Sequence, residues 1–136
     1  MITFEDFKKV EITVGKILSA EKIPDTDKLL RLSVDFGNNT NYESGTNIQI
    51  ETTPTRDIRQ IISGIAMYFP DAQTLVGKKC MFVTNLEPRI IKGYESNGML
   101  FAVSTDLPVG ASAQAGGGKF SLLEPNGEIP EGTRAR

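Results

Sequence analysis

The sequence predicts an all-β domain with the layout of a small sandwich or barrel. It contains five to seven short segments in which apolar and polar residues alternate, as they do in half-buried strands. Turn-forming Gly, Pro, Asn and Asp residues separate these segments at close spacing, and little of the chain has helical periodicity. The 136 residues suit one core, so we expect residues 1–136 to form a single domain.

The N-terminus predicts a short helix. Thr3 is a suitable cap, and Asp6 follows three residues later in a loose form of the capping box. Phe4 and Phe7 lie three residues apart and would share one apolar face of this helix.

The rest of the chain predicts short strands. Alternating residues indicate a strand over 10–20, with a bulge or bend at Gly15, and a half-buried strand over 30–36. A polar hairpin is expected at 38–55. Further strands are expected at 58–66, 79–86, 98–103 and 120–123, with a helical turn between 69 and 77 and a loop at 111–118.

Composition excludes several classes of function. The chain has no histidine and one cysteine, Cys80, which rules out a His-based catalytic triad and a disulfide within the chain. A structural zinc site needs several Cys or His ligands, so we expect no metal and no cofactor. Cys80 lies in an apolar run and predicts a buried, inert thiol. No segment has the length of a membrane span or the layout of a signal peptide, which predicts a cytoplasmic protein. The lack of a histidine and of an activated nucleophile predicts that it is not an enzyme.

Charge is unevenly distributed along the chain. The formal net charge is −2, which by itself argues against nucleic-acid binding. Residues 56–92, however, carry six basic and three acidic side chains, whereas the segments on both sides are acidic. Local charge governs contacts closer than the Debye length of about 8–10 Å, so this basic middle third can still serve an anionic partner.

The segment at 85–100 carries the strongest chemical signal. Arg89 and Lys92 are suited to phosphate groups, and Arg can bind them with two parallel hydrogen bonds. Asn85, Ser96 and Asn97 can bond sugar, phosphate or base edges. From these residues alone, an anion site and a plain surface loop are equally supported.

Five ordered blocks of the chain resemble the tRNA-binding domain family. Members of that family occur as stand-alone dimeric proteins, as parts of methionyl-tRNA synthetases, in synthetase-associated cytokine precursors, and as CsaA-type secretion chaperones. The blocks lie at residues 4–17, 24–29, 59–65, 85–100 and 130–133. The fourth block, with Asn85, Arg89 and the run from Ser96 to Met99, is the most specific.

The resemblance implies a fold and a function. It implies a five-stranded oligonucleotide/oligosaccharide-binding (OB) barrel with short flanking helices and an inserted polar hairpin. It also implies non-catalytic, structure-directed tRNA binding by a homodimer, with an aminoacyl-tRNA synthetase as a further partner. The residues expected to bind tRNA are Arg59, Ser63, Lys78, Lys79, Asn85, Arg89, Lys92, Ser96, Asn97 and Met99. The residues expected at the dimer interface are Phe4, Phe7, Phe120 and Leu122.

The chain also departs from the family pattern. Glu11 and Thr13 stand where the family usually has Asp and Arg, and Ile91 takes a place often held by a cation. These changes reduce positive charge and predict weaker RNA binding than in more basic relatives. The alternative function is a CsaA-type chaperone that binds peptides on the same fold.

Overall fold

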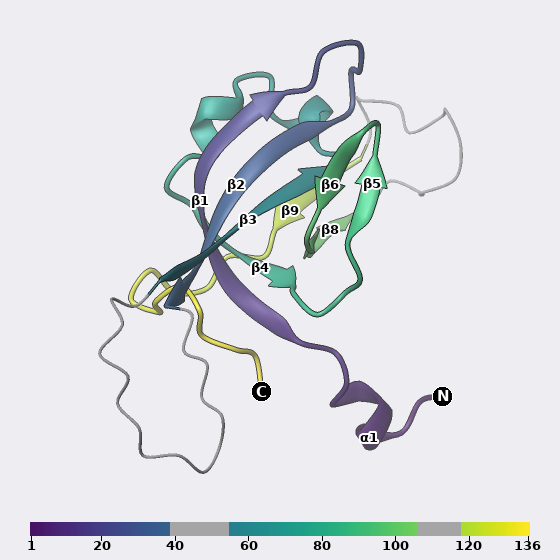
Figure 1. The fold of residues 1–136 in the computed structure, drawn as a ribbon, viewed down its shortest axis with the longest axis vertical. Helices are drawn as coiled ribbons and strands as arrows, with labels where there is room; N and C mark the ends of the chain where they lie inside the picture. Colours follow the sequence, from purple (N-terminus) through teal and green to yellow (C-terminus); the bar gives the residue numbers. More distant parts are fainter. Residues whose placement is uncertain (39–54, 106–117) are drawn as a thin grey trace.

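A five-stranded antiparallel sheet forms the centre of the molecule (Figure 1). The structure is a computed structural model that describes residues 1–38, 55–105 and 118–136. The strands run in the order β3-β2-β1-β4-β7, and two two-stranded sheets, β5-β6 and β8-β9, complete the described part. The strands of the main sheet are β1 (Ile12–Lys22), β2 (Leu30–Asn38), β3 (Arg56–Ser63), β4 (Lys79–Val83) and β7 (Met99–Leu100). The all-β prediction is therefore confirmed.

The long strand β1 allows the sheet to curl. Its residues 16–22 pair with β2, whereas residues 12–16 pair with β4. The register of β1 against β2 shifts between Ile17 and Ser19, which leaves Leu18 as an extra residue. Such a bulge increases local twist and bends the strand. The predicted bulge at Gly15 is therefore wrong in position, because Gly15 pairs regularly with Cys80.

Gly15 is required by packing. A Cβ atom at this position would lie 2.5 Å from the side chain of Val34, 2.6 Å from Phe36 and 2.9 Å from Phe82. The ring centroids of Phe36 and Phe82 are 5.3 Å apart in an edge-to-face arrangement. Gly15 thus leaves the space in which these two rings meet below β1.

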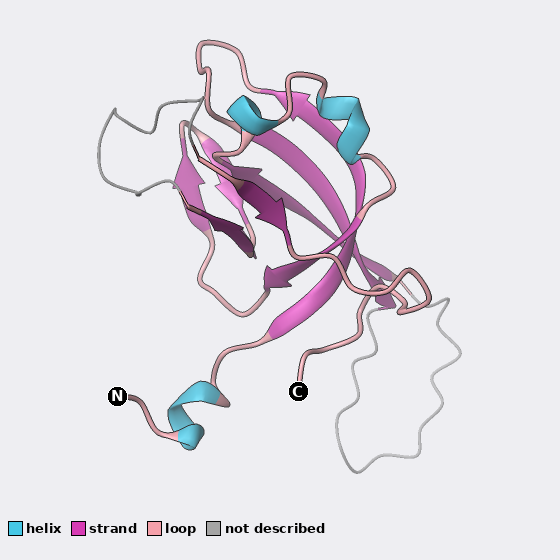
Figure 2. Ribbon diagram, turned by 180° about the vertical axis from the view of Figure 1, so that it is seen from behind, coloured by secondary structure: helices cyan, strands magenta, loops and turns pink. Residues whose placement is uncertain are grey.

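The core lies inside the curl of the sheet. Its largest fully buried side chains are Phe82, Ile17, Leu30, Leu32, Ile61, Leu75, Val34 and Cys80. Two short 3-10 helices, η1 (Ala66–Tyr68) and η2 (Ala72–Leu75), cover the end of the sheet opposite the N-terminal helix (Figure 2). The helical turn predicted between 69 and 77 is confirmed by η2, which is capped by the Asp71 side chain.

Several predicted strands end earlier than their sequence pattern suggests. β3 stops at Ser63 because the Ala66 N–H bonds the Lys28 carbonyl and the chain turns into η1. β4 stops at Val83. The expected strand at 98–103 divides at Phe101 into β7 and β8 (Ala102–Ser104), and β8 pairs with β9 (Phe120–Leu122). The predicted polar hairpin and most of the predicted loop at 111–118 lie outside the described residues.

A hairpin occupies the middle of the segment that the sequence indicated only as a loop. β5 (Arg89–Ile91) pairs with β6 (Tyr94–Ser96) across a two-residue turn at Lys92 and Gly93. Both turn residues have positive φ, 52° at Lys92 and 85° at Gly93. A turn with positive φ at both positions matches the right-handed twist of the flanking strands. The hairpin lies beside β3 (Figure 1).

Both ends of the chain meet the lower half of β1. Helix α1 (Phe4–Phe7) has the predicted capping box, with both the Thr3 and Asp6 side chains bonded to backbone. The C-terminal segment runs along β1, where the Val14 N–H bonds the Thr133 carbonyl at 2.8 Å and the Gly132 N–H bonds the Val14 carbonyl at 2.8 Å. None of the described helices has the length and apolar character required to cross a membrane.

Candidate functional site

The predicted tRNA-binding residues fall into two groups in the structure. In the first group the side chain is bonded within the chain: Arg59, Lys78, Lys79, Asn85 and Ser96. In the second group the side chains have no hydrogen bond or ion pair to the described residues: Ser63, Arg89, Lys92, Asn97 and Met99, of which Asn97 is held by its backbone. The two groups have different physical roles.

Asn85 holds the chain between α1 and β1. Its Oδ1 accepts a hydrogen bond from the Glu11 N–H at 2.8 Å, and its Nδ2 donates to the Lys9 carbonyl. One amide side chain thereby satisfies two backbone groups that lie 74 and 76 residues away in sequence. The short carboxamide of Asn carries an acceptor oxygen and two N–H donors, so at this position it can accept one backbone hydrogen bond and donate another.

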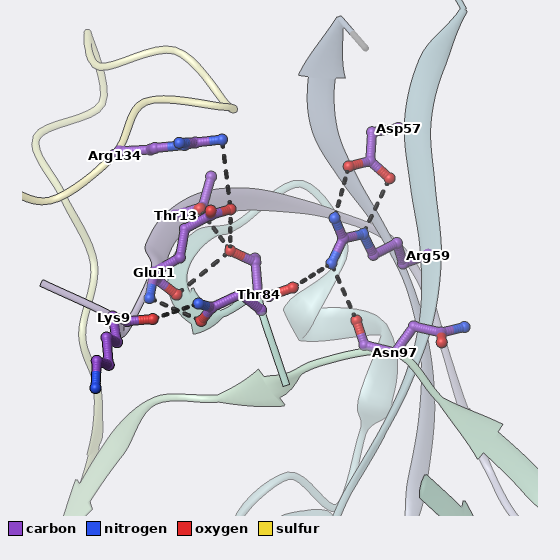
Figure 3. A network of polar contacts seen from close by, with 9 residues as sticks. Lys9, Glu11, Thr13, Asp57, Arg59, Thr84, Asn97 and Arg134 are labelled. Atoms are coloured by element: carbon purple, nitrogen blue, oxygen red, sulfur yellow. Dashed lines mark hydrogen bonds and ion pairs between the residues drawn. The ribbon is translucent and has the colours of Figure 1, made fainter. Parts of the chain in front are cut away.

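Arg59 joins three parts of the fold (Figure 3). Its Nε and Nη2 bond both carboxylate oxygens of Asp57 at 3.0 Å, and its Nη1 bonds the carbonyls of Thr84 at 2.7 Å and Asn97 at 3.4 Å. The guanidinium also lies 5.3 Å from the centroid of the Phe36 ring. This bidentate pair fixes the Arg59 side chain, 28% of which remains exposed.

Ser96 fastens the hairpin to β3. Its buried hydroxyl accepts a hydrogen bond from the Ile62 N–H at 3.0 Å and donates to the Gly98 carbonyl at 3.1 Å. The Asn97 N–H bonds the Gln60 carbonyl at 2.9 Å. The last residue of β6 and the residue that follows it are therefore bonded to β3, one by its side chain and the other by its backbone.

Lys78 and Lys79 contact the segment that follows β9. The Lys78 ammonium lies 3.4 Å from the Glu124 carboxylate. The Lys79 ammonium donates to the carbonyls of Gly127 at 3.2 Å and Ile129 at 3.1 Å. The positive charges of Lys78 and Lys79 are thus partly offset by a carboxylate and by backbone carbonyls of the same chain.

Arg89 and Lys92 remain exposed on the β5-β6 hairpin. The hairpin itself is held firmly, because Ser96 bonds β3 and the Arg31 guanidinium lies 5.7 Å from the centroid of the Tyr94 ring. The β5-β6 hairpin, which is held against the main sheet, thus carries two cations that have no counterion in the described chain.

A shallow apolar groove lies beside these two cations. Its volume is about 70 Å³, and it is lined by Ile62, Leu86, Glu87, Arg89, Ile91, Ser96, Gly98 and Met99. Leu86 and Met99 remain 47% and 46% exposed. The groove and the cations together combine apolar contact with positive charge, and the carboxylate of Glu87 in the lining offsets part of that charge.

A larger polar cavity of about 590 Å³ lies at the end of the sheet near both chain termini. We call it the polar mouth, and it is lined by Glu11, Thr13, Phe36, Asn38, Asp57, Arg59, Thr84, Gly132, Thr133, Arg134 and Arg136. Sequence reasoning did not identify Asp57, Thr84 or Arg134 as site residues. One usable signal was the spacing of Asp57 and Arg59, because residues two apart on a strand face the same side.

Nucleophilic and metal chemistry find little support among the described residues. Cys80 is buried in β4, and desolvation, together with the charge of Glu124, raises the pKa of its thiol to about 12. The predicted burial of the thiol is thereby confirmed, and its raised pKa favours the protonated, less nucleophilic form. The described ranges contain no cluster of three or more His, Cys, Asp or Glu residues placed to hold a metal ion.

Comparison with known proteins finds a family match that includes the fourth sequence block. Residues 46–134 match the model of a family described as "Putative tRNA binding domain". The chain belongs to the tRNA-binding domain family. This confirms the resemblance inferred from the five sequence blocks.

The tRNA-binding domain also matches parts of much longer proteins. It is 39% identical over 135 residues to the methionine–tRNA ligase of Methanospirillum hungatei JF-1, which covers 99% of this chain and 16% of the ligase. It is 35% identical over 133 residues to the methionine–tRNA ligase of Lactococcus lactis, again over 16% of that protein. The chain therefore spans about one-sixth of the length of these curated relatives.

Solved structures share the fold over the full chain. A MetRS-related protein from Pyrococcus horikoshii has 33% identity and a TM-score of 0.73, with 100% of this chain and 98% of that one covered. The chaperone CsaA from Bacillus anthracis has 24% identity and a TM-score of 0.69, with 100% and 99% covered. The CsaA structure supports the similarity of the fold alone.

Proposed function

We propose that the chain is a non-catalytic module that binds tRNA by its shape and backbone. The observation that carries this proposal is the pair of exposed cations, Arg89 and Lys92, on the supported β5-β6 hairpin. The hairpin lies within the segment that matches the family model. Arg89 and Lys92 would neutralise phosphates, and the apolar groove beside them would contact sugar or base surfaces.

The proposed architecture is a five-stranded OB barrel. Its support is the bonding between β3 and the C-terminal end of β6, where the Asn97 N–H donates to the Gln60 carbonyl and the Ile62 N–H donates to the Ser96 hydroxyl. These bonds bring the β3 edge of the sheet to the chain just before β7, which is the other edge. A barrel closed in this way removes the exposed edges that favour aggregation.

The two groups of predicted site residues receive different roles in this proposal. Arg89, Lys92 and Met99 contact the RNA, together with the Ser63 hydroxyl. Arg59, Asn85 and Ser96 position the hairpin and the strand ends through their internal bonds. Lys78 and Lys79 supply longer-range positive charge, which Glu124 reduces at Lys78.

A homodimer would increase avidity for one tRNA molecule. Helix α1 buries none of its residues, and Phe4 and Phe7 are 72% and 50% exposed, which makes them suitable for a partner protomer. Phe120 stacks on Tyr68 at 4.2 Å and Leu122 is buried in the core, so these two residues already pack within their own chain. We therefore centre the proposed interface on Phe4 and Phe7. Sedimentation of a Phe4→Ser/Phe7→Ser variant should give the monomer mass.

Removal of the two hairpin cations tests the proposed site. A gel shift with bulk tRNA should show roughly tenfold or greater weakening for Arg89→Ala/Lys92→Ala, because two phosphate contacts are lost. Lys8→Ala is the control, since Lys8 is an exposed cation at the C-cap of α1, and α1 lies away from the β5-β6 hairpin (Figure 1). Equal tRNA retention by all three proteins would contradict the proposal.

The peptide-binding chaperone is the competing function. The observation in its favour is the exposed apolar surface of Leu86 and Met99 in the groove. A pull-down with an unfolded preprotein distinguishes the two functions. Retention of the preprotein without retention of tRNA at low salt would replace the tRNA proposal with the chaperone function.

A further inference from the structure

The polar mouth has features of a ligand site that are separate from the hairpin cations. Its volume of about 590 Å³ is within the range of small-molecule pockets, about 300–1,000 Å³. It lies at the end of the sheet, between the lower half of β1, the start of β3 and the C-terminal segment. Neither Arg89 nor Lys92 lines it.

Arg59 provides the mouth with a flat, fixed surface. Asp57 and the carbonyls of Thr84 and Asn97 hold the guanidinium in place, and Phe36 supports it at 5.3 Å. The Arg59 side chain stays 28% exposed and lines the mouth together with Phe36. Nucleic-acid bases stack on Arg planes of this kind, and the fixed geometry lowers the entropy lost on binding.

Glu11 and Arg134 provide hydrogen-bonding groups at the same place (Figure 3). The Arg134 Nη2 lies 3.5 Å from the Glu11 Oε1, so an acceptor and a donor stand side by side. The Thr84 hydroxyl donates to the same Oε1 at 2.9 Å, and the Thr13 hydroxyl lies 2.8 Å from that of Thr84. This chain of bonds orients the carboxylate of Glu11.

Open bonding capacity remains on both groups. Glu11 Oε2 bonds no described residue, and Arg134 uses a single Nη2 contact while its side chain is 63% exposed. A guanidinium carries five N–H donors and a carboxylate about four acceptor sites. The pair can therefore bind a ligand edge that presents donors beside an acceptor.

We propose that the polar mouth binds one unpaired guanine nucleotide. The base stacks on Arg59, its N1–H and N2–H donate to Glu11, and its O6 accepts a hydrogen bond from Arg134. Guanine fits this pair because two donors stand next to one acceptor on its edge, whereas uracil offers one donor. The nucleotide is either free or an unpaired base of an RNA, and only the RNA source rests on the proposed tRNA-binding function.

Mononucleotide titrations followed by amide NMR test the mouth directly. GMP should give saturable shifts at Glu11, Thr84 and Arg134, with UMP and inorganic phosphate at least tenfold weaker. Arg134→Gln should weaken GMP binding about tenfold, because a charge-assisted hydrogen bond is lost. Arg134 is well exposed, so this variant should fold normally. The absence of saturable shifts, or equal binding of all four nucleotides, would overturn the proposal.

The Arg89→Ala/Lys92→Ala variant separates this inference from the proposed function. It should bind GMP like the wild-type chain even where its tRNA retention is lost. If GMP competes with tRNA for the wild-type chain, the bound nucleotide belongs to the RNA. If GMP binds without competition, the mouth serves a free nucleotide, and the guanine site stands independently of the tRNA proposal.

Discussion

Individual residues of the most specific sequence block have unequal roles. Asn85 and Ser96 bond backbone groups that no other described side chain satisfies. Arg89 and Lys92 extend from a hairpin without partners in the described chain. Sequence reasoning could identify all four because of their residue types and order. It could not separate the structural pair from the exposed pair, since a hydrogen-bonding side chain in sequence carries no sign of its partner.

Ser96→Ala should destabilise the fold. The substitution leaves the buried Ile62 N–H without its acceptor, at a cost of about 1–3 kcal/mol in the free energy of unfolding. Urea unfolding measures the change. Ser19→Ala, at an exposed serine with no side-chain hydrogen bond in the described chain, should stay within about 0.5 kcal/mol. A Ser96→Ala protein as stable as wild type would show that the hydroxyl does not fasten the hairpin.

Lys92→Asn should change stability and tRNA affinity independently. Asn favours the positive φ of 52° at this turn position more than Lys does, so the free energy of unfolding should hold or rise by a few tenths of a kcal/mol. The lost charge should weaken tRNA binding several-fold. Thermal unfolding and a gel shift on the same sample measure both. Unchanged affinity would remove Lys92 from the proposed interface.

At the scale of elements, alternating patterns predicted the central strands well. The first half of β2 and the start of β4 alternate between buried and half-buried side chains, which is the period of two that the sequence shows, whereas burial is continuous over residues 13–15 of β1 and 34–37 of β2. The β5-β6 hairpin could not be found in this way, because each strand has three residues and the turn is Lys-Gly rather than Asn-Gly or Asp-Gly. The bulge at Leu18 also left no signal, because it depends on how β1 meets β2.

Gly15→Ala tests the packing of β1 against the aromatic pair. The added Cβ would lie within 3 Å of Val34, Phe36 and Phe82, and overpacking of this kind costs about 1–3 kcal/mol. Gly64→Ala is the matched control, because its Cβ would meet no atom within 4 Å. Chemical denaturation should therefore separate the two variants. Equal stabilities would contradict the packing role of Gly15.

At the scale of the whole molecule, the basic middle third explains how a chain of net charge −2 can serve an anionic partner. Six basic residues lie between positions 56 and 92, but internal contacts already engage Arg56, Arg59, Lys78 and Lys79. The free positive charge is thus smaller than the sequence suggested. This supports the expectation of modest RNA affinity, which sequence reasoning reached from the departures at Thr13 and Ile91.

Cys80 reports on the cooperative opening of the whole fold. Burial raises the pKa of its thiol to about 12 from an ordinary value of 9.0, so the folded chain should resist alkylation at pH 8.

The raised pKa of Cys80 also sets how the free energy of unfolding changes with pH. Stability should hold below pH 9 and decline as the pH rises from 9 towards 12, because the unfolded chain loses its proton first. Urea unfolding measured at several pH values checks the decline in stability. Alkylation rates measured against urea concentration check the protection of the Cys80 thiol, and rapid labelling of the native protein would contradict that protection.

The salt dependence of tRNA affinity tests the central claim most directly. Each phosphate contact contributes a slope of about −0.7 to −0.9 to log K against log salt concentration. Affinity of the wild-type chain should fall steeply with salt, and Arg89→Ala/Lys92→Ala should be shallower by roughly 1.4 to 1.8 in that slope. Identical slopes for the two proteins, or no tRNA binding by the wild-type chain at low salt, would contradict the account.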